Sequence, residues 1–163
     1  MKHDFRACIG DICLEPMTLE LSQQYRVIRN EDENRKWFIT TDIVTWDMQN
    51  AWFDKYMKNE ADYMFAIKYK DIFSGGLAIY NVDKEKQKAE FGRLLIKQGN
   101  LRRNGIATAA IKMACNIAKE KMELKCLYLF VKDDNLVALK CYESTDFRKV
   151  GIVNGMIHMD RVL

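Results

Sequence analysis

The stretch from residue 89 to residue 131 constrains the fold more than any other part of the sequence. Residues 89–96 have the pattern of a strand, residues 107–122 that of an amphipathic helix, and residues 126–131 (CLYLFV) form a continuous apolar run. An apolar run of this kind is typical of a strand that is covered on both faces. A strand, a helix and a second strand in this order predict a parallel strand pair.

The remaining segments predict a sheet that is otherwise antiparallel. Runs of aromatic and β-branched residues indicate further strands that are joined by short turns, and Asn154–Gly155 favours a two-residue hairpin turn. We expect strands at 14–21, 63–69, 76–82, 89–96, 126–131, 148–153 and 156–161. Helices are expected at 32–37, 46–59, 107–122 and 136–144, whereas residues 25–29 fit either a short strand or a helical turn.

The fold class is therefore mixed α/β (α+β), with a mostly antiparallel sheet, one parallel pair and helices on its faces. No linker, repeat or change in composition divides the chain, so we expect a single domain over residues 1–163. Within it, residues 1–13 are expected to form a loosely packed N-terminal extension.

Composition narrows the class of protein further. With 48% hydrophobic residues the chain can bury a core, which excludes a disordered tail. Lys and Arg (26) nearly balance Asp and Glu (23), and the formal net charge of +3 argues against a nucleic-acid partner. No apolar run is long enough to span a membrane and the N-terminus has no apolar signal segment, so we expect no membrane partner and a cytoplasmic location.

The five cysteines predict neither a metal site nor a disulfide framework. They form no C-x-x-C pair and have no histidine set nearby, so we expect no metal. In a cytoplasmic protein all five are expected to be reduced thiols. For Cys141 we prefer buried packing to a role as nucleophile. The residues are Cys8, Cys13, Cys115, Cys126 and Cys141.

Residues 97–107 (KQGNLRRNGIA) form a basic, glycine-containing loop before the longest predicted helix. Backbone N–H groups at a helix start are unpaired and carry partial positive charge, so they can bind phosphate groups. Gly105 would let the backbone approach an anion closely, and Arg102 and Arg103 add charge beside it. The loop lacks the G-K-[ST] of a P-loop and the G-x-G-x-x-G of a dinucleotide site. From spacing alone, a solvated turn and an anion site both fit.

The same loop resembles a family signature. Residues 102–107 (RRNGIA) match the R/Q-x-x-G-x-G/A pattern of GNAT-type N-acetyltransferases, and residues 135–147 (NLVALKCYESTDF) resemble the family's N-x-x-A-x-x-x-Y-E-x-x-G-F. Asp146 stands where glycine is usual. The order of the predicted elements extends the resemblance over residues 14–163. It implies a GNAT-like fold in which the parallel pair is splayed, and an enzyme that uses acetyl-CoA.

The resemblance also implies roles for individual residues. Tyr142 would be the general acid for the leaving thiolate, and Glu90 is our candidate for the general base. A backbone N–H near Leu95 could polarise the thioester carbonyl. Asn135 would contact acetyl-CoA or fix the turn before its helix. The expected acetyl-CoA contacts are completed by Leu95, Ile96 and Lys97 along the pantetheine arm, and by Arg102, Arg103, Asn104, Gly105, Ile106 and Ala107 at the pyrophosphate.

The acceptor is expected to be a small-molecule amine. The segments around Arg35, Trp37, Phe38 and Trp52 resemble the branch of the family that acetylates nucleotide-linked amino sugars on the way to pseudaminic acid. A branch that acetylates the N-termini of ribosomal proteins is the first alternative. Others are a non-catalytic acyl-CoA-binding module, which an intact Tyr142 disfavours, and a protein-interaction domain. The oligomeric state stays open, with a homodimer as one option.

Overall fold

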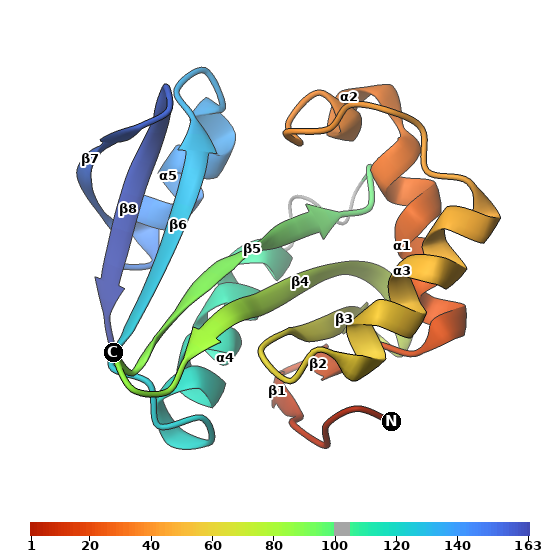
Figure 1. Cartoon of the computed structure of the whole chain (residues 1–163), viewed down its shortest axis with the longest axis horizontal. Helices are drawn as coiled ribbons and strands as arrows, with labels where there is room; N and C mark the ends of the chain where they lie inside the picture. The colour runs from red at the N-terminus through yellow and green to blue at the C-terminus, as the bar shows by residue number, and fades with distance from the viewer. Residues whose placement is uncertain (100–104) are drawn as a thin grey trace.

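The structure, a computed structural model of the whole chain, describes residues 1–99 and 105–163. These residues form one sheet in the order β1-β2-β3-β4-β5-β6-β8-β7 (Figure 1). The strands are β1 (Ala7–Ile9), β2 (Ile12–Pro16), β3 (Tyr63–Tyr69), β4 (Ile72–Asp83), β5 (Lys88–Ile96), β6 (Cys126–Lys132), β7 (Arg148–Val153) and β8 (Met156–Val162). The helices are α1 (Leu19–Asn30), α2 (Asp32–Arg35), α3 (Trp46–Lys58), α4 (Ile106–Glu120) and α5 (Leu136–Ser144). Within the described ranges, no helix is long and apolar enough to cross a membrane.

The parallel pair that the sequence predicted is formed by β5 and β6. The pairing covers three positions, from Lys88 with Cys126 to Glu90 with Tyr128. Beyond Glu90 the two strands separate, and Figure 1 shows β5 running away from β6 toward the opposite side of the molecule. The other neighbouring strand pairs in the described residues are antiparallel. The expected mixed sheet with a splayed parallel pair is confirmed.

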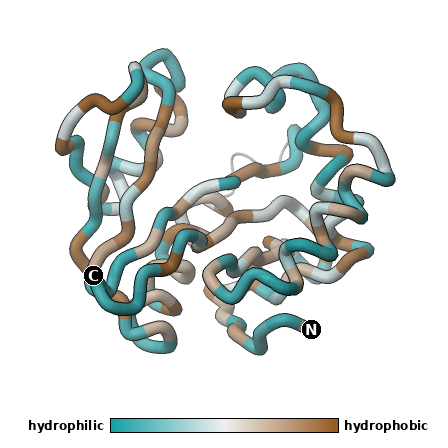
Figure 2. The backbone as a smooth tube through the Cα atoms, viewed as in Figure 1, coloured by the Kyte–Doolittle hydropathy of each residue, from teal (hydrophilic) through white to brown (hydrophobic). Residues whose placement is uncertain are grey.

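Helices cover both faces of the sheet, as expected. Successive side chains of a strand point to opposite faces, and β3 shows the two sides clearly. Phe65 and Ile67 pack in the core that α4 and α5 complete, whereas Met64 and Ala66 pack in a second core under α1 and α3. Figure 2 shows hydrophilic residues gathered in the turns at the rim, including the turn between β4 and β5.

The expected strand over residues 14–21 is wrong in its second half. The strand β2 ends at Pro16, and Thr18 caps helix α1 by accepting a hydrogen bond on its hydroxyl from the Leu21 backbone N–H at 3.2 Å. A threonine N-cap satisfies one of the free N–H groups at the helix start, so the apolar residues after it follow a helical period. Residues 25–29 belong to the same helix, which settles that alternative.

Residues 1–13, the expected N-terminal extension, contribute a strand to the edge of the sheet. Strand β1 pairs with β2 at the edge of the sheet, and the His3 ring lies 4.7 Å from the ring of Phe65. Cys8 and Cys13 are cross-strand partners in this hairpin and form a disulfide. The expectation of five reduced thiols is therefore wrong for this pair, because a spacing of five residues does not reveal the hairpin register. Cys115, Cys126 and Cys141 are free thiols.

Gly75 provides a test of how closely β4 approaches β5. A Cβ atom at this position would lie 2.0 Å from the carbonyl oxygen of Leu95. We expect Gly75→Ala to lower the free energy of unfolding by about 1–3 kcal/mol, the usual cost of overpacking, as measured by chemical denaturation. Gly151→Ala is the matched control, because a Cβ at Gly151 meets no atom within 4 Å. Equal stability of the two variants would contradict the close approach.

Candidate functional site

Glu90 lies on β5 at the last position that pairs with β6. Its half-buried carboxylate accepts two hydrogen bonds: Tyr80 donates its hydroxyl to Oε1 at 2.7 Å, and Asn81 donates its amide to Oε2 at 2.9 Å. Each carboxylate oxygen has a second lone pair that can accept a further donor. Glu90 is therefore held in one orientation and can still receive a hydrogen bond or a proton from a ligand.

Tyr80 is the residue of β4 directly opposite Glu90. Burial, together with the hydrogen bond to the Glu90 carboxylate, raises the pKa of Tyr80 well above its usual range, so Tyr80 stays protonated and remains a donor. The neighbouring Gly92 leaves room for this hydroxyl, because a Cβ there would lie 2.9 Å from it. The contact between Tyr80 and Glu90 thus depends on a glycine in β5.

Two irregularities in the pairing of β4 with β5 lie on either side of this contact. Between Gly76 and Ala78 the register shifts, so that β5 supplies an extra residue, and Arg93 takes a positive φ of 53°. Between Tyr80 and Asp83 the extra residue is on β4, and Asn81 has a φ of 50°. Bulges re-aim side chains and interrupt pairing. Here the two bulges, at Arg93 and at Asn81, lie next to the residues that surround Glu90.

An ion pair anchors the first of these bulges. Arg93 donates to both carboxylate oxygens of Asp62, at 2.8 and 2.9 Å, and Asp62 is only 5% exposed. The guanidinium lies 4.3 Å from the ring centroid of Tyr80 and 5.8 Å from that of Trp52. Tyr25 of α1 donates its hydroxyl to the Arg93 carbonyl at 2.9 Å. A connected network therefore runs from Asp62 through Arg93 and Tyr80 to Glu90.

Tyr142 belongs to helix α5, on the face of the sheet opposite to Glu90. Its ring is part of the core between the sheet and the helices α4 and α5. Its ring meets the rings of Phe91 and Phe147 edge to face, at centroid distances of 6.1 and 5.8 Å. Burial raises the pKa of Tyr142, so the phenol keeps its proton. Phe91 follows Glu90 directly, and consecutive strand residues point to opposite faces. Glu90 and Tyr142 thus lie on opposite faces of the sheet, next to the point where β5 leaves β6.

The end of β5 offers a free strand edge beside this point. Leu95 and Ile96 pair with Gly76 and Gly75 of β4 on one side, and Lys97 donates its N–H to the Ser74 carbonyl at 2.8 Å. On the side of β6, the described residues provide no strand partner for β5 beyond Glu90. Backbone groups along that edge are available to an extended ligand.

Helix α4 begins close by in sequence. Gly105 precedes it in the left-handed conformation with φ of 67°, Ile106 is fully buried, and Ala107 is half-buried. The first turn carries no acidic residue, so nothing in it competes with an anion for the N–H groups at the helix start. Arg102, Arg103 and Asn104 lie outside the described residues.

Asn135 and Cys141 can be assigned from their contacts. Asn135 caps α5 by accepting a hydrogen bond from the Ala138 backbone N–H at 3.3 Å, which is the turn-fixing role among its two expected roles. Cys141 lies 4.0 Å from the Thr108 hydroxyl, and burial raises the pKa of its thiol, which disfavours the nucleophilic thiolate.

The four expected acceptor residues fall into two places. Trp52 on α3 stacks on Tyr56 at 5.3 Å and joins the Glu90 network through Arg93. Arg35, Trp37 and Phe38 belong to α2 and the loop after it, where Arg35 pairs with Asp32 at 2.7 Å and the Arg29 guanidinium lies 4.6 Å from the Phe38 ring centroid. The structure thus brings Trp52 to the network that holds Glu90, whereas the other three belong to α2 and the loop after it.

Sequence reasoning missed Tyr80, Asp62 and Arg93. Arg93 and Asp62 are 31 positions apart, and no motif marks either. In the sequence, Tyr80 is one residue of the expected strand at 76–82. The one available signal was the position of Gly92 beside Glu90, because a glycine inside a strand often marks a bulge or a close approach.

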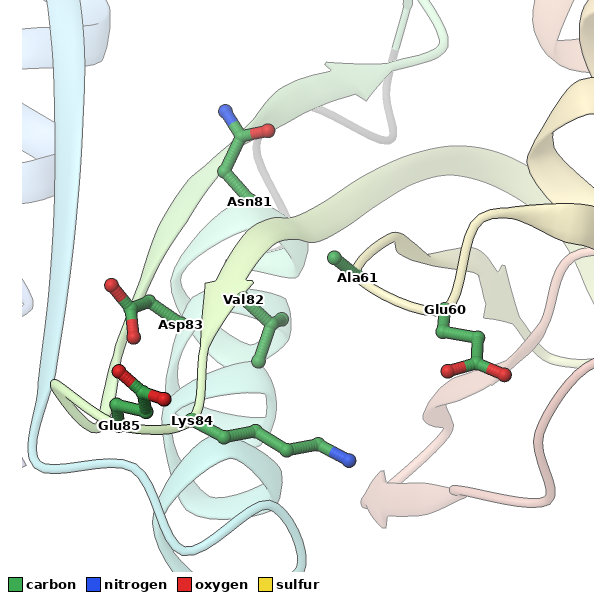
Figure 3. Close-up of a pocket in the computed structure, with 7 residues that line it drawn as sticks. All are labelled: Glu60, Ala61, Asn81, Val82, Asp83, Lys84 and Glu85. Carbon is green, nitrogen blue, oxygen red and sulfur yellow. The ribbon is translucent and has the colours of Figure 1, made fainter.

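Two surface hollows lie near the network. The larger, about 600 Å³, borders it through Asn81 and is lined by Glu60, Ala61, Asn81, Val82, Asp83, Lys84 and Glu85. Figure 3 shows that Glu60, Lys84 and Asn81 point in different directions there, so we assign it no ligand. The smaller, about 300 Å³, is lined by Lys88, Cys126, Tyr128, Phe130, His158 and Asp160. In the part of the chain that the structure describes, no group of three or more His, Cys, Asp or Glu residues could hold a metal ion.

Known proteins share this architecture. Spermidine N-acetyltransferase from Vibrio cholerae, in complex with CoA and spermine, has a TM-score of 0.85 at 17% identity, covering 94% of this chain and 96% of that one. RimJ from Mycobacterium smegmatis, in complex with CoA-disulfide, has a TM-score of 0.77 at 19% identity, covering 93% and 81%. No curated protein matches the chain. At these identities the structural likeness shows the fold alone.

The sequence itself matches a family. Residues 11–148, most of the chain, match the acetyltransferase (GNAT) domain. The match spans the diverging strands β5 and β6, the helix α4 between them and both Glu90 and Tyr142. The chain therefore belongs to the GNAT family of acetyltransferases, as its two motifs predicted.

Proposed function

We propose that the protein transfers the acetyl group of acetyl-CoA directly to a primary amine in a ternary complex, with Glu90 as general base and Tyr142 as general acid. The divergence of β5 from β6 carries this proposal. The strand pairing ends at Glu90. The carboxylate of Glu90 is held on one face of the sheet there, and the protonated phenol of Tyr142 lies on the other face. An acid and a base on opposite sides of one gap suit acyl transfer between two ligands that enter from opposite faces.

The residues present fit acetyl-CoA, which supplies an activated acyl thioester. The free edge of β5 at Leu95 and Ile96 can hydrogen-bond the amide groups of a pantetheine arm, as a peptide strand would. The start of α4 at Gly105, with no acidic residue in its first turn, suits the pyrophosphate. Arg102 and Arg103 would add charge there.

Each residue has one task in the transfer. Glu90, directly or through a water, accepts a proton from the attacking amine as the new C–N bond forms. An N–H of the β5 bulge near Leu95 donates to the carbonyl oxygen as negative charge develops on it. As the C–S bond breaks, Tyr142 donates its hydroxyl proton to the departing thiolate. Tyr80 and Asn81 keep Glu90 aimed at the gap.

For the acceptor, we propose the amino group of a nucleotide-linked amino sugar. The loop after α2 carries Lys36, with its ammonium 4.9 Å from the Trp37 ring centroid, and the aromatic Phe38. Cationic groups next to aromatic rings suit a phosphorylated ligand with a ring system. The same positive charges disfavour a polyamine, although solved relatives of this fold include spermidine N-acetyltransferases.

A substrate panel tests the acceptor class. With UDP- or dTDP-linked amino sugars, we expect the rate of thiol release from acetyl-CoA to exceed that with spermidine or with N-terminal peptides by about tenfold or more. The free energy of one hydrogen bond to a charged group corresponds to a factor of this size. Preference for a peptide would support the ribosomal-protein type instead. Stabilisation by acetyl-CoA without turnover on any amine would support a non-catalytic binding module.

Replacing Tyr142 tests the general acid. Tyr142→Phe keeps the edge-to-face contacts with Phe91 and Phe147 and removes only the hydroxyl. We expect kcat to fall by about 10²–10⁴-fold, the usual contribution of general acid catalysis, with little change in acetyl-CoA affinity by calorimetry. Tyr69→Phe, at the end of strand β3, is the control. An unchanged kcat would remove Tyr142 from the mechanism.

Replacing Tyr80 tests how Glu90 is held. Tyr80 donates one of the two hydrogen bonds that hold the Glu90 carboxylate. We therefore expect Tyr80→Phe to lower kcat/KM by about tenfold, the range of a hydrogen bond to a charged group, with little change in acetyl-CoA affinity by calorimetry. In the Glu90→Gln background the same change should lower kcat/KM much less, because the effects of residues in one hydrogen-bond network are not additive. Equal effects of Tyr80→Phe in both backgrounds would mean that Tyr80 is only structural.

A further inference from the structure

The open face of β6 leads away from Glu90 toward the loop after α2. Along β6 the residues Leu127, Leu129 and Val131 are buried, whereas the alternate residues Tyr128 and Lys132 are half-buried on the other face. Tyr128 is opposite Glu90 in the parallel pair. Lys132 stands four residues further along the same face, about 13 Å at the rise of a strand.

Two aromatic rings lie on this face between the reacting centre and Lys132. Phe130 pairs with His158 of β8, and their rings stack at 4.9 Å with an angle of 24°. Tyr128 meets Phe130 edge to face at 5.9 Å. Phe130 and His158 line the smaller surface hollow together with Tyr128, so their rings provide aromatic surface against which a sugar or another ring can rest.

Lys132 crosses from this face to the other arm of the fold. Its ammonium donates to the backbone carbonyl of Lys36 at 2.7 Å and to that of Phe38 at 3.4 Å, although the residues are more than 90 positions apart. Figure 1 shows the loop after α2 facing the upper end of β6 across the open side of the fold. The contact therefore lies above the gap between β5 and β6.

The charge of Lys132 is uncompensated there. Within residues 1–99 and 105–163, no carboxylate forms an ion pair with Lys132 or with Lys36, although the exposed Asp133 and Asp134 follow Lys132 in the chain. An ammonium has three N–H donors, and the two carbonyls use two of them. Arg35, by contrast, is paired with Asp32. The remaining donor of Lys132, a cation without an ion-pair partner among these residues, suits an anion.

We propose that Lys132 binds a phosphate group of the acceptor and so selects phosphorylated amino sugars. The inference rests on the proposed function and adds a site to it: the amine lies at Glu90, the sugar rests on Phe130 and His158, and the phosphate meets Lys132. The contact of Lys132 with the loop holds the ammonium in place before the ligand arrives. Lys132 is thus a specificity-determining residue on β6, the strand from which β5 separates.

The experiment compares Lys132→Met with wild type on matched acceptors. We expect the KM for a UDP-linked amino sugar to rise about tenfold or more, the range of a hydrogen bond to a charged group, while the KM for the same sugar without its nucleotide and phosphates stays unchanged. The wild-type advantage should shrink as salt is raised. Lys121→Met, an exposed lysine at the end of α4, removes the same charge and should change neither constant.

Three results would overturn the proposal, two from kinetics and one from calorimetry. An equal rise in KM for the phosphate-free sugar would mean that Lys132 only shapes the loop. A rise in the KM for acetyl-CoA would assign the anion site to a phosphate of CoA.

Calorimetry with UDP as the probe keeps the test independent of turnover. If the wild type acetylates no sugar nucleotide yet binds UDP through Lys132, the proposed acceptor fails while the anion site stands; if UDP binding is the same in Lys132→Met, the site fails by itself.

Discussion

The separation of β5 from β6 after Glu90 is the constraint on which the rest of the structure depends. Three residues pair in parallel, and the next residues of β5 have no strand partner on that side in the described parts of the chain. Backbone groups left without a partner inside a fold must find one elsewhere. The sheet therefore has an unpaired edge along β5 beyond Glu90, which we call the slot. A ligand with an extended polar backbone can pair with this edge. The helix α4 starts after the same strand, so one unit supplies both the slot and a helix start.

The alternation of side chains along β5 then divides the site into two halves. Ala89 and Phe91 face the core that contains Tyr142, whereas Glu90 faces the opposite side with Tyr80. Tyr142 is buried and keeps its proton, whereas the half-buried Glu90 keeps lone pairs that can accept further donors. The two residues therefore lie on opposite faces of the sheet at the position where the parallel pairing ends.

Sequence patterns predicted the elements that are set by local chemistry. The strand at 63–69 and the helix at 136–144 have the bounds that the sequence indicated, because alternation, helical period and the Asn135 cap are local features. Register and long-range pairing are not local. Cys8 and Cys13 meet only because the hairpin sets their register, and the alternation before Thr18 hides the helix that it caps. The second family motif contains Tyr142, and the place of Glu90 at the start of its strand made it the candidate base, but neither signal pointed to Tyr80 or Asp62.

Arg93 shows why such residues escape sequence reasoning. A non-glycine residue in the left-handed region costs about 1–2 kcal/mol, and Arg93 adopts a φ of 53° within a strand. The buried Asp62 carboxylate holds its guanidinium, and the Tyr25 hydroxyl holds its carbonyl. Removing one partner of a buried ion pair leaves a charge without compensation, so the bulge and the pair support each other. The same guanidinium lies against Tyr80, which orients Glu90. The local strain at Arg93 is thus tied to the orientation of the Glu90 carboxylate, which is our proposed general base.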